Sequence, residues 1–316
     1  MTLTKSAKMK KITFFKKIRF LIEYILLHII RLILVLIPYN MAIELGASLG
    51  RMAAKIITKR FRLTVDNIQK AFPEKSQKES QTIALKSWEN MAMVTVEFAK
   101  ATCTSKEGML KKCKFENTKE ITKHLRSGKG VLVHLGHFTN WEIIFQTPPL
   151  PNFKTAAIAR HIRNPYIDKW ITSLRQRFGM EIISHRNPFF SCVKKLKKGY
   201  MVGIAMDQNM PANAIFSPFL GRMCATTPLT ALLALKMQTP VFPLKVTRNP
   251  DGVIKAVFEK PIFPDKTYSE ENVKNMVNVL NRKLEDWIKQ APHLWLWAHN
   301  RWKREHDAPK KGTSDE

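Results

Sequence analysis

Short apolar runs alternate with longer segments of helical periodicity along most of the chain. Apolar runs of roughly 4–8 residues between turn residues are typical of buried strands, and the sequence has them at 131–136, 154–159, 181–184, 201–206, 241–247 and 253–259. Helical periodicity covers 165–178, 188–198, 226–238 and 270–290. Ser76 and Glu79 form a capping box that opens another long helix, to about Ala101. Strands spaced by helices predict an α/β fold: a single mixed, mostly parallel sheet covered by helices, with its last two strands paired as an antiparallel hairpin.

The N-terminal region carries the most apolar segment, residues 18–37, which ends before Pro38. Its 20 residues would span roughly 30 Å as a helix, enough to cross a hydrocarbon core. Four polar residues interrupt it within about half of the helix circumference and leave a Leu/Ile face; these are Arg19, Glu23, His28 and Arg31. The pattern predicts a membrane-associated helix that lies in the interface, or a tilted span whose polar side packs on protein. A buried core helix preceded by a basic tail is the alternative.

The charge balance supports a membrane. Lys and Arg number 53 against 25 Asp and Glu, a formal net charge of +28, so a polyanion is expected: nucleic acid, an anionic membrane surface or a phosphorylated substrate. Six lysines precede the apolar helix, favour an anionic membrane over nucleic acid and predict a cytoplasmic N-terminus; they are Lys5, Lys8, Lys10, Lys11, Lys16 and Lys17. We therefore expect a basic N-terminus with an anchoring helix (1–40), an α/β domain (41–303) and a polar tail (304–316).

The cysteines argue against a metal or disulfide scaffold. The chain has 4 of them, scattered and without CxxC spacing: Cys103, Cys113, Cys192 and Cys224. This usage fits a reducing compartment, and no metal site or cofactor is expected.

Candidate chemistry follows the first apolar strand, in the sequence HLGHFTNWE (134–142). His137 and Glu142 form an H-x4-E pair in a turn at the carboxyl edge of the predicted sheet, where open α/β folds bind ligands. Glu142 is expected to orient the imidazole, so that His137 acts as a general base on a hydroxyl. A structural histidine is the alternative interpretation, and His134, inside the strand, is expected to be structural.

Six segments in order resemble the bacterial late acyltransferases of lipid A biosynthesis, over roughly residues 18–303. They are the apolar helix, RFRLTVDNIQKAFPEKS (60–76), HFTNWE (137–142), IARHIRNPYID (158–168), GIAMDQN (203–209) with FSPFLGR (216–222), and HLWLWAHNRWK (293–303). The sequence departs from the family pattern at four positions, which leave the acceptor open: Thr139 stands for a glycine, His161 and Met206 for prolines, and Asn209 for an acidic residue.

The resemblance implies transfer of a fatty acyl chain from acyl carrier protein, or from coenzyme A, to a hydroxyl of a phosphorylated glycolipid, most simply a lipid A precursor. It implies the cell inner membrane, with the active site on the cytoplasmic side. His137 and Glu142 would be the catalytic pair, and Asn140 with backbone N–H groups would stabilise the oxyanion. Arg160 would bind a headgroup phosphate, and Asp207 with Gln208 would line the same cleft.

Other functions remain open. The acceptor is alternatively a phosphatidylinositol mannoside or a lysophospholipid, although the F-P-E-G block typical of lysophosphatidate acyltransferases is absent from the sequence. A non-catalytic basic protein that binds nucleic acid or membranes would leave the H-x4-E turn unexplained. Trp295, Trp297 and Trp302 suit either a membrane interface or a core.

Overall fold

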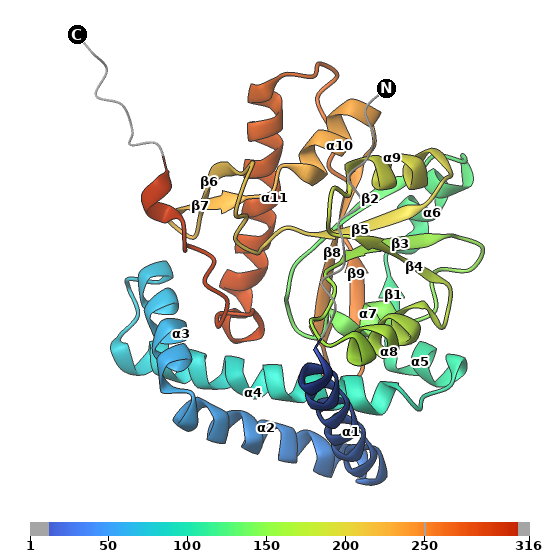
Figure 1. Ribbon diagram of the computed structural model, residues 1–316. Helices are drawn as coiled ribbons and strands as arrows, with labels where there is room; N and C mark the ends of the chain where they lie inside the picture. Colours follow the sequence, from blue (N-terminus) through green and yellow to red (C-terminus); the bar gives the residue numbers. More distant parts are fainter. Residues whose placement is uncertain (1–12, 250, 309–316) are drawn as a thin grey trace.

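The structure is a computed structural model that describes residues 13–249 and 251–308. Eleven α-helices and nine β-strands alternate through most of this part of the chain (Figure 1). The helices are α1 (Phe14–Leu36), α2 (Tyr39–Ile56), α3 (Thr58–Ala71), α4 (Gln77–Ala101), α5 (Lys106–Lys112), α6 (Thr118–Arg126), α7 (Glu142–Gln146), α8 (Pro165–Gln176), α9 (Phe189–Lys197), α10 (Leu229–Met237) and α11 (Glu270–Gln290). The strands are β1 (Cys113–Glu116), β2 (Val131–Leu135), β3 (Thr155–Ala159), β4 (Met180–Ser184), β5 (Met201–Ala205), β6 (Ile215–Phe219), β7 (Arg222–Thr226), β8 (Val241–Arg248) and β9 (Ile254–Phe258).

Seven strands form the central sheet in the order β1-β9-β8-β2-β5-β3-β4. All neighbours pair in parallel except β8 and β9, which form the expected antiparallel hairpin. Side chains alternate along β2 between two cores: Leu132 packs in one, and Val131 and Val133 pack in the other. Both faces of the sheet are therefore buried, as the continuous apolar runs indicate.

The mixed α/β fold and its mostly parallel sheet confirm the prediction, and all six expected strands are present. The structure adds β1 at the sheet edge and a separate two-stranded hairpin, β6–β7. The capping box is also present: Ser76 accepts a hydrogen bond from the backbone of Glu79, and Glu79 accepts one from the backbone of Ser76.

Helices α1 to α4 form a layer beside the sheet, at the bottom of the view in Figure 1. Helix α4 packs against α1, α2 and α3. The polar residues of α1 contact protein: Glu23 accepts a hydrogen bond from Asn164, at the start of α8, and Arg31 donates one to Thr102, after α4. The opposite face of α1 is exposed and apolar, including Ile22, Ile29 and Ile33 at 50–53% exposure.

Helix α2 extends this apolar surface, which we call the α1–α2 face. Its residues on α2 are Met41, Leu45, Leu49, Met52 and Ile56, all exposed. Among residues 13–249 and 251–308, none of the helices is both long and apolar enough to cross a membrane. Lys5, Lys8, Lys10 and Lys11, expected to lie against a membrane, and residues 309–316 of the polar tail fall outside the described residues.

Candidate active site

Two neighbouring parallel strands bring His137 and Asp207 together. β2 and β5 pair in register, with Leu135 opposite Ala205 at their carboxyl ends. His137 and Asp207 each stand two residues beyond these ends. Matched positions after parallel neighbours emerge at one edge of the sheet, so residues 70 positions apart in sequence become direct partners.

The imidazole of His137 is held at one nitrogen and open at the other. Its Nδ1 lies 2.8 Å from Oδ1 of Asp207, and its backbone N–H donates to Oδ2 of the same carboxylate at 2.7 Å. Its Nε2 faces the exposed side-chain amide of Gln208, with 3.2 Å between Nε2 and the amide nitrogen. The His137 side chain is 20% exposed, whereas that of Asp207 is 1% exposed.

These contacts fix the imidazole tautomer. An ionised carboxylate only accepts hydrogen bonds, so the Nδ1 of His137 carries the proton that faces Asp207. The Gln208 amide nitrogen only donates, so the Nε2 opposite it holds a lone pair. A neutral imidazole with an accessible Nε2 lone pair is the form required of a general base.

The charge of Asp207 sets the protonation behaviour of this pair. Burial disfavours the imidazolium, but the neighbouring carboxylate and its hydrogen bond outweigh this effect and raise the pKa of His137. Burial likewise opposes the ionised form of Asp207, yet the charge of His137 and the hydrogen bonds it receives hold the pKa of Asp207 well below its usual range. His134 differs: burial lowers its pKa to about 4, and its Nε2 bonds the backbone oxygen of Leu280. It is a neutral core residue, as expected.

The segment after α11 also contacts His137 and Asp207. Trp295 is 1% exposed and donates from Nε1 to Oδ2 of Asp207 at 2.8 Å. The backbone N–H of Leu296 donates to the oxygen of His137 at 3.1 Å. Gly136 allows the close approach of Asp207, because a Cβ at this position would lie 2.7 Å from a methyl group of Leu284 and 3.1 Å from Oδ2 of Asp207.

Glu142 does not make the predicted hydrogen bond to His137. Both of its carboxylate oxygens accept from Arg175 of α8, at 2.6 and 2.7 Å, and both side chains are 16% exposed. Its charge still contributes to raising the pKa of His137. The sequence spacing places Glu142 in the first turn of α7, while Asp207, after the neighbouring parallel strand β5, supplies the carboxylate that contacts His137.

Asn140 is also placed differently from the expectation. Its side-chain amide donates to Glu97 of α4 at 2.7 Å, and its Oδ1 accepts from the backbone of Ile143 at 3.0 Å. Asn140 is 1% exposed. A buried amide with these partners braces the turn rather than facing a substrate oxygen, so the expected oxyanion contact of its side chain is not what the structure shows.

Arg160 lies at the carboxyl end of β3, the strand next to β5, and is exposed. Within the described part of the chain it makes no hydrogen bond to His137 or Asp207. Its charge, after burial, helps to lower the pKa of His185, which follows β4. Arg160 therefore stands in a basic group at the same edge as His137, on the outer strands.

Several residues of the site carried no clear signal in the sequence. Trp295 was expected at a membrane interface or in a core, and the structure buries it with Trp297 and Trp302, which excludes the interface for all three. Arg301 is fully buried and donates to the backbone oxygens of Gln208 and Ala225. A tryptophan-rich segment that ends in an arginine was the available hint, but its partners lie more than 70 residues away.

The family model and the relatives found by sequence agree with one another. The family model described as bacterial lipid A biosynthesis acyltransferase matches residues 9–304. A lipid A biosynthesis lauroyltransferase of Escherichia coli (strain K12) is 25% identical over 278 residues, which cover 86% of this chain and 88% of the relative. A lipid A biosynthesis acyltransferase of Haemophilus influenzae is 25% identical over 275 residues, covering 84% of this chain and 83% of the relative. Among solved structures, the 1-acyl-sn-glycerophosphate acyltransferase PlsC from Thermotoga maritima is 14% identical, with a TM-score of 0.35 over 79% of this chain and 97% of that chain.

Proposed function

Because the chain belongs to the bacterial lipid A biosynthesis acyltransferase family and is therefore an acyltransferase, we propose that it moves a fatty acyl chain from an acyl carrier protein thioester to a hydroxyl of a phosphorylated lipid A precursor. The observation that carries the proposal is the His137–Asp207 pair, with the Nε2 of His137 on the exposed side. A coenzyme A thioester is the alternative donor. The names of the relatives support the acceptor class.

In the proposed reaction, Nε2 of His137 takes the proton of the acceptor hydroxyl as its oxygen attacks the thioester carbonyl. Asp207 stabilises the imidazolium that forms. Collapse of the tetrahedral intermediate breaks the carbon–sulfur bond, and the imidazolium returns the proton to the departing thiolate. The hydroxyl must replace the Gln208 amide at Nε2, which leaves that amide as a hydrogen-bond donor beside the reacting centre.

Glu142 acts in this proposal through charge rather than through contact. Its carboxylate, fixed by Arg175, favours the imidazolium of the transition state. Arg160 binds a headgroup phosphate of the acceptor, because its guanidinium is exposed at the carboxyl edge of the sheet and suits bidentate phosphate contacts.

The proposed setting is the cytoplasmic side of the inner membrane, with the α1–α2 face lying on the anionic bilayer surface. Support comes from the exposed apolar residues of both helices, and from Glu23 and Arg31 of α1, which bond to Asn164 at the start of α8 and to Thr102 after α4. Such a surface buries its apolar side chains at the boundary between headgroups and acyl chains.

The activity is tested with the purified full chain in detergent, a dodecanoyl acyl carrier protein and an under-acylated phosphorylated lipid A precursor. Mass spectrometry should detect one added acyl chain, and His137→Ala should abolish the addition. His306→Ala is the matched control, since this side chain is 79% exposed near the end of the described chain, and it should retain full activity. Transfer by His137→Ala at the wild-type rate would refute the mechanism.

Parallel reactions separate the alternatives. Transfer only from the coenzyme A thioester would replace the donor, and transfer only to a lysophospholipid or a phosphatidylinositol mannoside would replace the acceptor. Wild-type protein that transfers to none of these acceptors would refute the proposed acceptor class.

The membrane proposal has its own test, co-sedimentation with phosphatidylglycerol vesicles. The triple variant Ile22→Ser/Ile29→Ser/Ile33→Ser should lose most vesicle binding, because it places three hydroxyls on the apolar face of α1. The control is Leu110→Ser/Phe190→Ser/Phe263→Ser, which changes three exposed apolar residues outside α1 and α2. Equal binding by the two triple variants would contradict the assignment of this face.

A further inference from the structure

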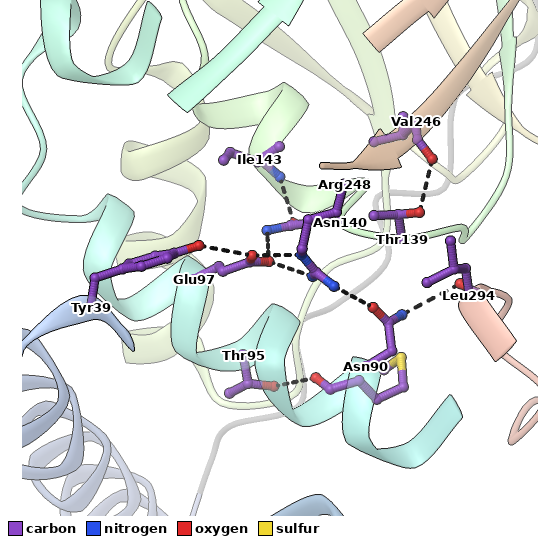
Figure 2. Close-up of polar contacts among 11 residues, drawn as sticks. Tyr39, Asn90, Thr95, Glu97, Thr139, Asn140, Ile143, Val246, Arg248 and Leu294 are labelled. Carbon is purple, nitrogen blue, oxygen red and sulfur yellow. Dashed lines mark hydrogen bonds and ion pairs between the residues drawn. The ribbon is translucent and has the colours of Figure 1, made fainter. Parts of the chain in front are cut away.

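Glu97 is a buried carboxylate of α4 that the reaction described above does not use. Its side chain is 4% exposed, and three other elements donate hydrogen bonds to it (Figure 2). Asn140 donates at 2.7 Å, Arg248 at 2.8 and 2.9 Å, and the hydroxyl of Tyr39 at 3.2 Å. A carboxylate this deep requires such compensation, so its position is determined by the groups around it.

Asn140 has one possible orientation in this arrangement. Its Oδ1 accepts the backbone N–H of Ile143 in α7, and its amide nitrogen faces Glu97. If the Asn140 amide were rotated by half a turn, its NH₂ would face the N–H of Ile143, donor against donor. Its oxygen would then face the carboxylate of Glu97, acceptor against acceptor. Glu97 therefore fixes the Asn140 side chain, and Asn140 joins the turn after β2, residues 136–141, to the first turn of α7. We call residues 136–141 the His137 turn.

Arg248, at the end of β8, extends the same set of contacts to the other side of the His137 turn. Its Nη1 donates to Asn90 of α4 at 3.0 Å, and Asn90 donates to the backbone oxygen of Leu294 at 3.4 Å. That oxygen also accepts from the backbone N–H of Thr139 at 2.8 Å. Thr139 has a φ of 51°, a left-handed conformation that costs a β-branched residue energy and persists only when its surroundings hold it.

We propose that Glu97 is a positioning residue: through Asn140 it holds the His137 turn in the geometry that acyl transfer requires, and the paired contacts of Arg248 hold the Glu97 carboxylate in place for this task. The proposal rests on the acyltransferase reaction proposed above. It assigns to α4 and β8 a part in catalysis without contact between their residues and the substrate.

Glu97→Gln is the direct test. Oε2 of Glu97 accepts from both Asn140 and Nη2 of Arg248, and Oε1 accepts from Nε of Arg248. The amide nitrogen of an introduced glutamine therefore opposes a donor in either orientation, at Nε of Arg248 or at Asn140, so the turn loses part of its support. We expect kcat to fall about 100-fold, the effect of a misplacement near 1 Å, with KM nearly unchanged. The matched control is Glu305→Gln, which removes the charge of another carboxylate paired with arginine, Arg222, outside the turn. It should leave kcat at the wild-type value.

A second variant distinguishes positioning from a loss of stability. In Glu97→Gln/Arg248→Met the guanidinium donors are gone, so the introduced glutamine can offer its carbonyl to Asn140 without opposing another donor of this group. We expect the double variant to regain at least part of the lost kcat. A kcat equal to wild type in Glu97→Gln, measured per folded molecule, or no recovery in the double variant, would overturn the proposal.

Hydrogen exchange supplies a readout that needs no activity. In Glu97→Gln, peptides covering residues 138–146 should exchange faster than in wild type, because Asn140, which accepts the N–H of Ile143, is held less firmly. Glu305→Gln should not change them. If Glu97→Gln does not fold, Arg248→Lys decides: it keeps the charge but not the paired contacts, and a kcat equal to wild type would overturn the proposal. An inactive wild type refutes the proposed function. Unchanged hydrogen exchange in a folded Glu97→Gln refutes this inference. If Glu97→Gln does not fold, unchanged exchange in Arg248→Lys refutes it instead.

Discussion

Two buried carboxylates bound to the His137 turn show how the choice of partner decides what an acid does. Asp207 and Glu97 are almost equally buried, with side chains 1% and 4% exposed. Asp207 faces an imidazole, whose charge changes near neutral pH. Glu97 faces a guanidinium, which stays charged at all relevant pH values. The Asp207–His137 pair is suited to proton transfer, and the Glu97–Arg248 pair is suited to holding the turn in one conformation.

The largest effect that separates the two is expected from Asp207→Asn. An asparagine cannot stabilise the imidazolium, and it can bind the wrong imidazole tautomer. We expect kcat to fall on the order of 10⁴-fold, as for the corresponding change in Ser-His-Asp enzymes, far beyond the effect of Glu97→Gln. Steady-state kinetics with circular dichroism as a check of folding would measure it. Similar losses in the two variants would remove the distinction.

Glu142→Gln tests a third carboxylate, which contacts neither His137 nor the partners of Glu97. The change keeps the size of the side chain but removes the charge that faces Arg175. We expect kcat to fall roughly 10- to 100-fold, the equivalent of one charge-assisted hydrogen bond, and less than in Asp207→Asn. Arg175→Lys is the companion variant, since it retains the charge and loses the paired geometry. A loss as large as that of Asp207→Asn would mean that Glu142 meets His137 during the reaction.

The pH dependence should distinguish the two acids by direction. The base form of His137 is lost as pH falls, and because Asp207 raises its pKa, kcat/KM should begin to fall above the ordinary value of 6.5. In Asp207→Asn the opposing effect of burial remains and only the smaller contribution of Glu142 still raises the pKa of His137, so the residual activity should fall at a lower pH than in wild type. In Glu97→Gln the midpoint should stay in place. A shifted midpoint in Glu97→Gln would show that this acid also acts on the imidazole.

The smallest effect is expected from Tyr39→Phe. Tyr39 makes the longest of the contacts with Glu97, and burial together with the charge of Glu97 raises its pKa to about 12, so it remains a donor. Removing the hydroxyl should cost about 0.5–1.5 kcal/mol of the free energy of unfolding and leave kcat almost unchanged. Urea unfolding combined with kinetics would test this; a large loss of kcat would extend the positioning set to α2.

The contacts of the two acids also show which features could be predicted from the sequence and which could not. The strands were readable because buried parallel strands need continuous apolar runs, and the His137 turn was found at the end of the first of them. The hairpin β6–β7 was missed because its strands mix polar, aromatic and proline residues. The family resemblance placed Asp207 in the cleft, but only strand order reveals that β5 lies beside β2.

Local spacing misled in a specific way. An acid five residues after a histidine suggests a pair, yet Glu142 bonds Arg175 and Asn140 bonds Glu97. Both partners come from helices distant in sequence, and a sequence pattern carries no information about which helix packs on a turn. Contacts of this kind are set by tertiary packing, so the residues could be named from the sequence while their partners could not.

Helix α4 lies between the helices of the proposed membrane face and the His137 turn. α4 packs on α1 and α2 and also supplies Glu97 to the His137 turn, so it joins the helices of the proposed membrane face to the turn that carries His137. If the α1–α2 face lies on the bilayer as proposed, a glycolipid acceptor reaches the enzyme from within the membrane. The search for the acceptor becomes lateral diffusion in two dimensions, and turnover should follow the mole fraction of acceptor in the membrane rather than its bulk concentration.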